Sequence, residues 1–162
     1  MDDADAEWVK KLLSRRSRTP EFHRLCRQTI SALDASNLSE WAVDLLAIAL
    51  IESTARPFVA RAAERVLQFA ATALHLNWRP TAGPFQLRSA PWRTGEAAVV
   101  AVTLLVGKGC SLSSETDEIA RAWHGSSKRQ PGARLGYGSA FRLSRDLVMK
   151  LDGVPATRRF FT

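Results

Sequence analysis

The stretch Trp41-Ala-Val-Asp-Leu-Leu-Ala-Ile-Ala-Leu-Ile51 decides the fold, because almost all of it is apolar and Glu52 follows it directly. In a helix, positions i, i+4, i+7 and i+11 share one face, and here they are Trp41, Leu45, Ile48 and Glu52. A carboxylate on a face meant for the core meets a low dielectric, which favours its neutral form. A carboxylic acid held protonated in this way can donate a proton in glycosidic-bond chemistry. The plain alternative is a solvated glutamate at a helix end.

Length and composition predict one globular domain. The chain has 162 residues, of which 46% are hydrophobic and 24% are charged, enough for a sizeable core. The longest apolar run, residues 97–106, is too short to be a transmembrane segment. The acidic start Met-Asp-Asp-Ala-Asp-Ala-Glu7 does not resemble a secretory signal. We therefore expect a cytoplasmic chain, a module of a longer protein, or a protein delivered by another apparatus, and localisation stays open.

The charge balance and the rare residue types limit the choice of partners. Two cysteines predict free thiols, and three scattered histidines predict neither a metal site nor a cofactor. A net charge of +7 favours a polyanionic partner such as nucleic acid, an anionic membrane surface or an acidic glycan. No nucleic-acid motif accompanies the arginine clusters, so nucleic acid is the disfavoured choice, and a solvated basic surface is the simpler interpretation.

Hydrophobic periodicity predicts helices almost throughout and therefore an all-α class. The expected helices are 4–15, 20–35, a third that begins after a cap at Asn37 or Ser39 and ends near Glu52, 58–75, 96–106, a sixth that runs from a cap at Ser113 or Ser114 to His124, and 137–151. Thr19 and Pro20 are a typical N-cap and first-turn pair for the second of these helices. We expect a single domain, 1–162, with an N-terminal helical extension (1–36), a core (37–151) and a tail (152–162).

Several short motifs occur in a suggestive order. These are Glu52-Ser53, Gly83-Pro-Phe-Gln86, Trp92-Arg-Thr-Gly-Glu96, Glu118-Ile-Ala-Arg-Ala-Trp-His-Gly125 and Gly136-Tyr-Gly138. On these motifs, residues 41–150 resemble the lysozyme-like superfamily. One branch, the lytic transglycosylases, has a Glu-Ser pair at the end of a core helix, a Gly-x-x-Gln loop, an aromatic-Asn-Gly segment and a later Tyr. The other branch, the peptidoglycan glycosyltransferases, has a similar order of motifs. It also has a similar spacing between the first Glu and the Gln-containing loop, and the chain resembles this branch more closely.

The resemblance implies a two-lobed helical domain with a cleft. The implied substrate is a peptidoglycan strand or a lipid-linked glycan precursor built of N-acetylglucosamine and N-acetylmuramic acid. The resemblance implies Glu52 as general acid/base and Glu96 as the assisting carboxylate. The distance between two such carboxylates decides whether a glycosidase retains or inverts configuration.

The candidate substrate-binding residues surround these two carboxylates in the motifs: Ser53, Arg56, Gln86, Arg88, Arg93, Trp123 and Tyr137. An amide can hold a sugar hydroxyl, an aromatic ring can stack on a sugar face, and an arginine can bind an anionic group such as a pyrophosphate. Each also has an ordinary structural role open to it, in a loop, in the core or in a surface ion pair.

Two alternatives to glycosyl transfer stay open. The first is lytic cleavage of peptidoglycan, in which Glu52 alone handles the proton. The second is a catalytically degenerate module that keeps the fold and binds a glycan or a protein partner. The departures from the glycosyltransferase motifs favour this second alternative, since the Gln-Gln pair is reduced to Gln86 and Arg93 precedes Glu96 by three residues instead of four.

Overall fold

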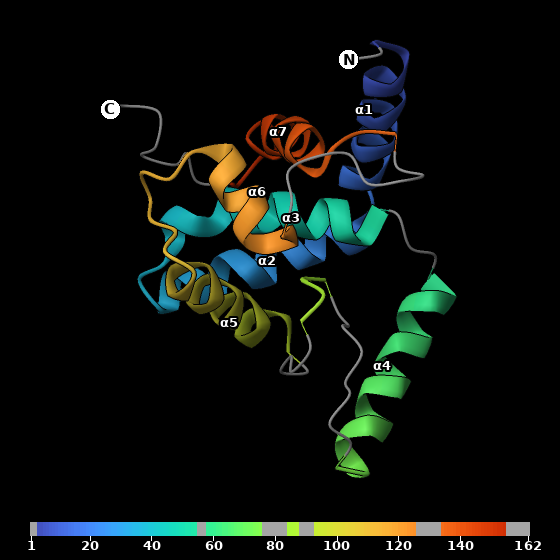
Figure 1. Ribbon diagram of the computed structural model, residues 1–162, viewed down its shortest axis with the longest axis vertical. Coiled ribbons are helices and arrows are strands. Elements are labelled where there is room, and N and C mark those ends of the chain that lie inside the picture. The colour runs from blue at the N-terminus through green and yellow to red at the C-terminus, as the bar shows by residue number, and fades with distance from the viewer. Residues whose placement is uncertain (1–2, 55–57, 76–83, 88–92, 126–133, 155–162) are drawn as a thin grey trace.

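The protein is an all-α domain of seven α-helices, with no strand among the residues that the structure describes. The structure is a computed structural model that describes residues 3–54, 58–75, 84–87, 93–125 and 134–154. The helices are α1 (Asp3–Ser17), α2 (Pro20–Ala35), α3 (Ala42–Thr54), α4 (Phe58–Ala73), α5 (Thr94–Gly107), α6 (Thr116–His124) and α7 (Tyr137–Val148) (Figure 1). A short 3-10 turn, Ser39–Trp41, leads into α3. Among the described helices, none has both the length and the apolar character that a membrane span requires.

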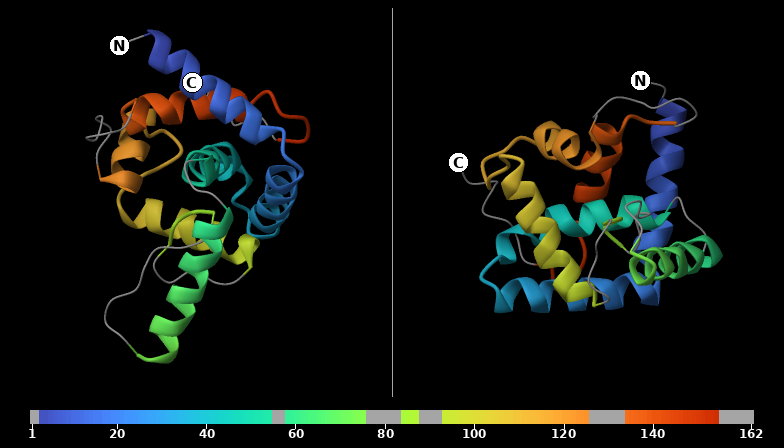
Figure 2. Two further views of the ribbon diagram at one scale, coloured as in Figure 1. Left: turned by 90° about the vertical axis from the view of Figure 1, so that its right-hand side faces the viewer. Right: turned by 60° about the horizontal axis from the view of Figure 1, so that its bottom comes forward.

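Helix α3 is the centre of the domain. The left-hand view of Figure 2 looks almost along α3 and shows α1, α2, α5, α6 and α7 arranged in a ring around it. Every residue from Trp41 to Leu50 is buried, so the helix has no solvent face until its last turns. The spacing of Trp41, Leu45 and Ile48 predicted one buried face, whereas all faces of this part of the helix are buried. A helix that is apolar on all sides belongs inside a core, and the surrounding ring provides that core.

Two groups of buried side chains meet α3 on different sides. The first group includes Leu45, Ile48 and Ala49 of α3 and joins them to the inner sides of α5, α6 and α7. The second includes Val43, Leu46 and Leu50 and joins them to α1, α2 and the end of α7. Because residues of α1 and α2 are part of this packing, the first two helices help to enclose α3.

Helices α3 and α7 run antiparallel, and polar contacts fix their register. The Arg145 guanidinium lies 3.0 Å from the Asp44 carboxylate. The Ser144 hydroxyl donates to the carbonyl oxygen of Ala47 at 2.9 Å. The Tyr137 hydroxyl donates to Glu52 Oε1 at 3.0 Å. Three contacts spread along α3 therefore hold one face of α7 against it.

Local sequence signals correctly placed several helix ends. Helix α2 begins at Pro20 and ends at Ala35 as expected, and the Thr19 hydroxyl accepts a hydrogen bond from the Phe22 N–H at 3.3 Å. Helix α6 ends at His124 as expected, where Gly125 adopts the left-handed conformation with φ of 83°. Such a terminal position strongly favours glycine, because other residues meet a steric penalty there.

Two predicted N-caps were wrong. Leu38, without a side-chain cap bond, precedes the 3-10 turn, and the Ser39 hydroxyl bonds the Asp34 carboxylate instead. The N-cap of helix α6 is Glu115, whose N–H donates to Glu118 Oε2 at 3.0 Å. The Ser114 hydroxyl instead accepts a hydrogen bond from the Ser111 N–H. In both places the serine hydroxyl has another partner close in the chain. Helix α7 also ends at Val148, three residues earlier than expected.

Helix α4 projects from the ring of helices as an arm (Figures 1 and 2). Two polar contacts join it to the turn at 84–87: the Gln68 amide donates to the carbonyl oxygen of Leu87 at 2.8 Å, and the Gln86 amide lies 3.4 Å from Glu64 Oε2. From residue 62 onward, its large apolar side chains point outward, with exposed fractions of 66% at Val66, 53% at Leu67 and 59% at Phe69. The apolar residues that recur at helical spacing along it, Ala62, Val66, Phe69 and Ala73, are all exposed.

Candidate functional site

Two of the predicted site residues meet at the end of α3. Glu52 lies in the last turn of α3, where the helix leaves the core and its side chain is half-buried. Tyr137 is the first residue of α7 and is buried, and its hydroxyl donates to Glu52 Oε1 at 3.0 Å. They are 85 residues apart in the chain. The fold thus brings together a carboxylate and a phenol that had been singled out in separate motifs.

The environment of Tyr137 keeps its hydroxyl protonated. Burial raises the pKa of this hydroxyl well above its ordinary value of 10.0, and the charge and hydrogen bond of Glu52 raise it further. The phenol is therefore a permanent donor at physiological pH. The phenol is therefore the donor and the Glu52 carboxylate the acceptor of their hydrogen bond.

A second ring lies against Tyr137. The imidazole of His124, at the end of α6, stacks on the phenol with ring centroids 4.3 Å apart and planes inclined by 5°. His124 is exposed, whereas its neighbour Trp123 is half-buried and packs on the first core group. The stacked pair fixes the orientation of Tyr137 and places a solvent-accessible imidazole beside the Glu52–Tyr137 contact. Sequence analysis included His124 in a motif but gave it no role.

Gln86 occupies a turn, residues 84–87, between two buried neighbours, Phe85 and Leu87. Its φ of 50° lies in the left-handed region, which is uncommon for a residue other than glycine and often accompanies a functional or constrained position. Its amide nitrogen is 3.4 Å from Glu64 Oε2 of α4. The geometry therefore gives Gln86 a role in attaching α4 to the core. The motif suggests a sugar-binding role in addition.

Glu96 and Arg93 lie at a different place. Both are exposed and line a cavity of about 870 Å³ between α2 and the start of α5. The contacts that the structure describes do not connect them with Glu52 or Tyr137. This cavity therefore lies beside the second predicted carboxylate, while the hydrogen-bonded pair lies at the end of α3.

Three further predicted site residues are not characterised. Arg56 and Arg88 lie outside the described residues, as does the side chain of Ser53, although its backbone belongs to α3. Among the described residues, no group of three His, Cys, Asp or Glu side chains could hold a metal ion.

Sequence analysis missed the buried ion pair of Asp44 and Arg145. Asp44 is fully buried, Arg145 is 8% exposed, and the Arg145 guanidinium also donates to the Thr116 hydroxyl at 2.9 Å. The signal was present, because Asp44 is the single polar residue within 41–51 and a charge buried so deeply needs a partner. Its partner is distant in the chain, and no local pattern points to it.

Comparisons of the chain with protein-family models, with curated protein sequences and with solved structures gave no match.

Proposed function

We propose that this chain is a lysozyme-like helical domain that cleaves a glycosidic bond in a peptidoglycan-like glycan. In this proposal, two lobes enclose a cleft that opens at the end of α3. Glu52 is the general acid/base, and the observation that carries the proposal is the 3.0 Å hydrogen bond between Tyr137 and Glu52. A half-buried carboxylate with a fixed donor is well suited to giving and accepting a proton at a sugar oxygen.

The chemistry needs few other groups. Glu52 protonates the glycosidic oxygen, and the bond from this oxygen to the anomeric carbon breaks. A hydroxyl group then forms a new bond to the anomeric carbon, and Glu52, now a carboxylate, accepts the proton that the hydroxyl releases. Tyr137 orients the carboxylate and, because its own pKa is raised, donates without losing its proton. His124 and Trp123 offer ring faces for sugar stacking at this end of α6.

We propose the lytic form of the reaction, in which Glu52 handles the proton alone. Glu96, the assisting carboxylate of the alternative form, lines the cavity between α2 and α5. Glu52 instead accepts a hydrogen bond from Tyr137 of α7. A polymerising reaction on a lipid-linked precursor is the alternative, and it requires the two carboxylates to act on one substrate.

The proposal is tested by the release of soluble fragments from purified peptidoglycan. We expect Glu52→Gln to lower the rate by about 10²–10⁴, as for the loss of a general acid/base, with the fold unchanged by circular dichroism. Asp146→Asn is the matched control, since it makes the same carboxylate-to-amide change at an exposed position of α7. Equal rates for Glu52→Gln and the wild type would rule out the proposed site.

Glu96→Gln separates the two forms of the reaction. A full rate in this variant supports cleavage by Glu52 alone. A loss as large as that of Glu52→Gln supports two cooperating carboxylates, and the assay is then repeated with the lipid-linked precursor.

A non-catalytic binding module is the second candidate, and one observation favours it. The Tyr137–Glu52 contact is also the last of the three contacts that hold α7 on α3, so a structural role alone explains it. This candidate predicts that the wild type releases no fragments but sediments with insoluble peptidoglycan. Fragment release by the wild type would exclude it.

A further inference from the structure

The cavity between α2 and α5 is a hollow that is open to solvent. It has a volume of about 870 Å³, and most of the side chains that line it are exposed. Its polar lining comes from both helices: Arg27, Gln28, Ser31, Arg93, Thr94 and Glu96. Ala32 and Ala35 of α2 and Gly95 of α5 complete the lining.

The two walls of the cavity are held at a short distance. A Cβ atom added to Gly95 would lie 2.7 Å from the Ala32 Cβ and 3.5 Å from the Gln28 carbonyl oxygen. Since real Cβ atoms do not approach so closely, the backbones of α2 and α5 meet here because position 95 has no side chain. The polar side chains that line the cavity therefore come from two helices, α2 and α5, whose spacing is fixed by this contact.

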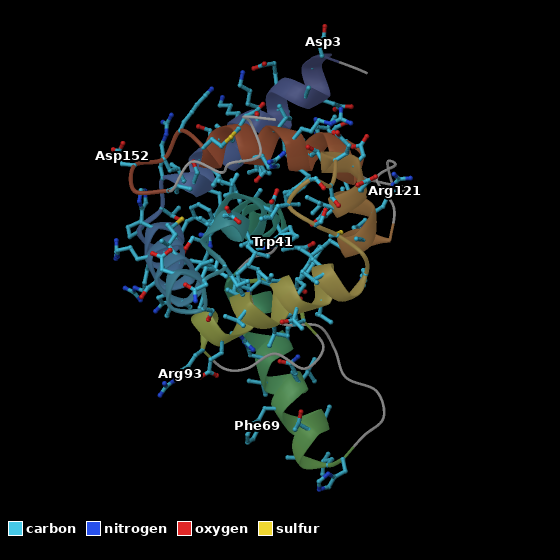
Figure 3. All side chains as sticks on the ribbon, turned by 90° about the vertical axis from the view of Figure 1, so that its left-hand side faces the viewer. Asp3, Trp41, Phe69, Arg93, Arg121 and Asp152 are labelled. Atoms are coloured by element: carbon cyan, nitrogen blue, oxygen red, sulfur yellow. The ribbon has the colours of Figure 1, made fainter. Side chains whose placement is uncertain are left out.

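The cavity has a net positive charge, because two arginines and one glutamate line it. Arg27 and Arg93 form no ion pair with any residue that the structure describes, and both side chains are exposed. Arg93 lies at the start of α5, as the N-cap residue of that helix (Figure 3). Two guanidinium groups at one cavity are typical of a site for a phosphate, which arginine binds through paired, charge-assisted hydrogen bonds. The start of α5 adds further positive potential.

The remaining groups select a particular kind of phosphate ligand. Glu96 lines the same cavity, where its carboxylate repels a bare anion but accepts hydrogen bonds from hydroxyl groups. Gln28 and Ser31 offer further donors and acceptors on the α2 side. A ligand with a phosphate at one end and hydroxyl groups at the other satisfies both parts of the lining.

From these observations we infer that the cavity between α2 and α5 binds a sugar phosphate. The phosphate lies between Arg27 and Arg93, and the sugar hydroxyls contact Glu96, Gln28 and Ser31. This site is separate from the Glu52–Tyr137 contact and does not depend on the proposed glycan cleavage.

The test is a calorimetric titration of the whole chain with glucose 1-phosphate, inorganic phosphate and free glucose at constant ionic strength. We expect glucose 1-phosphate to bind most tightly, inorganic phosphate more weakly, and free glucose not measurably. Arg27→Ala and Arg93→Ala should each weaken glucose 1-phosphate binding about tenfold or more, since each removes charge-assisted hydrogen bonds. Arg18→Ala is the matched control, because it removes the same charge from an exposed position that does not line the cavity.

Glu96→Gln tests the selectivity. It removes the repulsion of the bare anion and weakens the acceptor for the hydroxyls, so the affinities for glucose 1-phosphate and inorganic phosphate should converge. The inference is overturned if the wild type binds neither phosphate, if Arg27→Ala and Arg93→Ala bind like the wild type, or if Arg18→Ala weakens binding as much as they do. Glu52→Gln should bind glucose 1-phosphate normally, so a failure of the cleavage proposal would leave this result unaffected.

Discussion

Helices α3 and α4 are consecutive in the chain and rich in apolar residues, yet most apolar side chains of α3 are buried and the large apolar side chains described in α4 are exposed. Helix α3 is enclosed on all sides as far as Leu50, and its two carboxylates, Asp44 and Glu52, have partners on α7. Helix α4 turns its polar side toward the turn at 84–87 and its apolar side toward solvent. The comparison teaches that apolar content does not decide burial. Burial depends on whether other helices are placed to cover the surface.

The largest effect is expected at the buried ion pair that ties α7 to α3. Arg145→Met leaves Asp44 charged and buried without its partner, so we expect a loss of about 3–5 kcal/mol in the free energy of unfolding. Arg142→Met is the matched control, because Arg142 forms its 2.7 Å pair with Asp117 at the surface, where such pairs contribute about 0–1 kcal/mol. Urea titration measures both, and equal losses would contradict the central position of α3.

One leucine substitution in each helix compares directly how much α3 and α4 contribute to the free energy of unfolding. Leu46 of α3 is fully buried, whereas Leu67 of α4 is 53% exposed. We expect Leu46→Ala to cost about 2–5 kcal/mol through the cavity it leaves, and Leu67→Ala to cost at most about 0.5 kcal/mol. The same urea titration measures the difference. A large loss for Leu67→Ala would mean that α4 packs against something in solution.

In α4 the important inward contact is polar. Gln68→Ala leaves the buried carbonyl oxygen of Leu87 without its hydrogen bond, and we expect a loss of about 1–3 kcal/mol. Thr72→Ala serves as the control, because the exposed Thr72 hydroxyl bonds only within its own helix, to the Gln68 carbonyl oxygen. Amide hydrogen exchange should report faster opening of α4 in Gln68→Ala, with α3 unaffected. Unchanged exchange would show that this contact does not hold the arm.

The last turn of α3 should show a dependence on pH. Tyr137→Phe removes the hydrogen bond to Glu52 and is expected to cost about 1 kcal/mol near neutral pH. Because the pKa of Tyr137 is higher in the folded protein, the unfolded chain releases its proton first as the pH rises above about 10. The free energy of unfolding then falls with increasing pH in the wild type, and falls less in Tyr137→Phe.

The alkaline measurement needs a background without Cys26. Burial raises the pKa of this thiol from 9.0 to about 11, so it produces a fall of the same sign that begins near pH 9. Both proteins should therefore carry Cys26→Ala. Parallel alkaline curves with and without the Tyr137 hydroxyl would mean that the phenol is not buried as described.

The smallest effect is expected on the outer side of α4. Phe69 points away from the rest of the molecule (Figure 3), with 59% of its surface exposed. We expect Phe69→Ser to change the free energy of unfolding by no more than about 0.5 kcal/mol and to lower self-association in light scattering. A loss above about 1 kcal/mol would show that this face is covered, and the contrast with α3 would disappear.

Features fixed by neighbouring residues could be predicted from the sequence. The start of α2 follows from Thr19 and Pro20, the end of α6 from Gly125, and the all-α class from the spacing of apolar residues. Competing caps could not be resolved, since Ser39 and Ser114 each had a second partner within a few residues. The orientation of α4 could not be predicted either, because the pattern shows that a helix has an apolar stripe but not what covers it.

The candidate site was predictable only in part. Glu52 and Tyr137 were both singled out, and the fold brings them together, but their contact depends on the pairing of α3 with α7. Glu96 was grouped with Glu52 by motif order, whereas the structure places it at the cavity between α2 and α5. The partnership of Asp44 and Arg145 was missed for the same reason, since sequence distance hides which helix faces meet.

The antiparallel pairing of α3 with α7 has a consequence for folding during synthesis. Ala47 and its partner Ser144 are 97 residues apart, and a ribosome adding about 5–20 residues per second takes on the order of 5–20 seconds to make that segment. Until then, Asp44 has no cation to neutralise it and α3 lacks one wall of its enclosure. The innermost helix, although made early, thus acquires its native surroundings only when α7 has emerged.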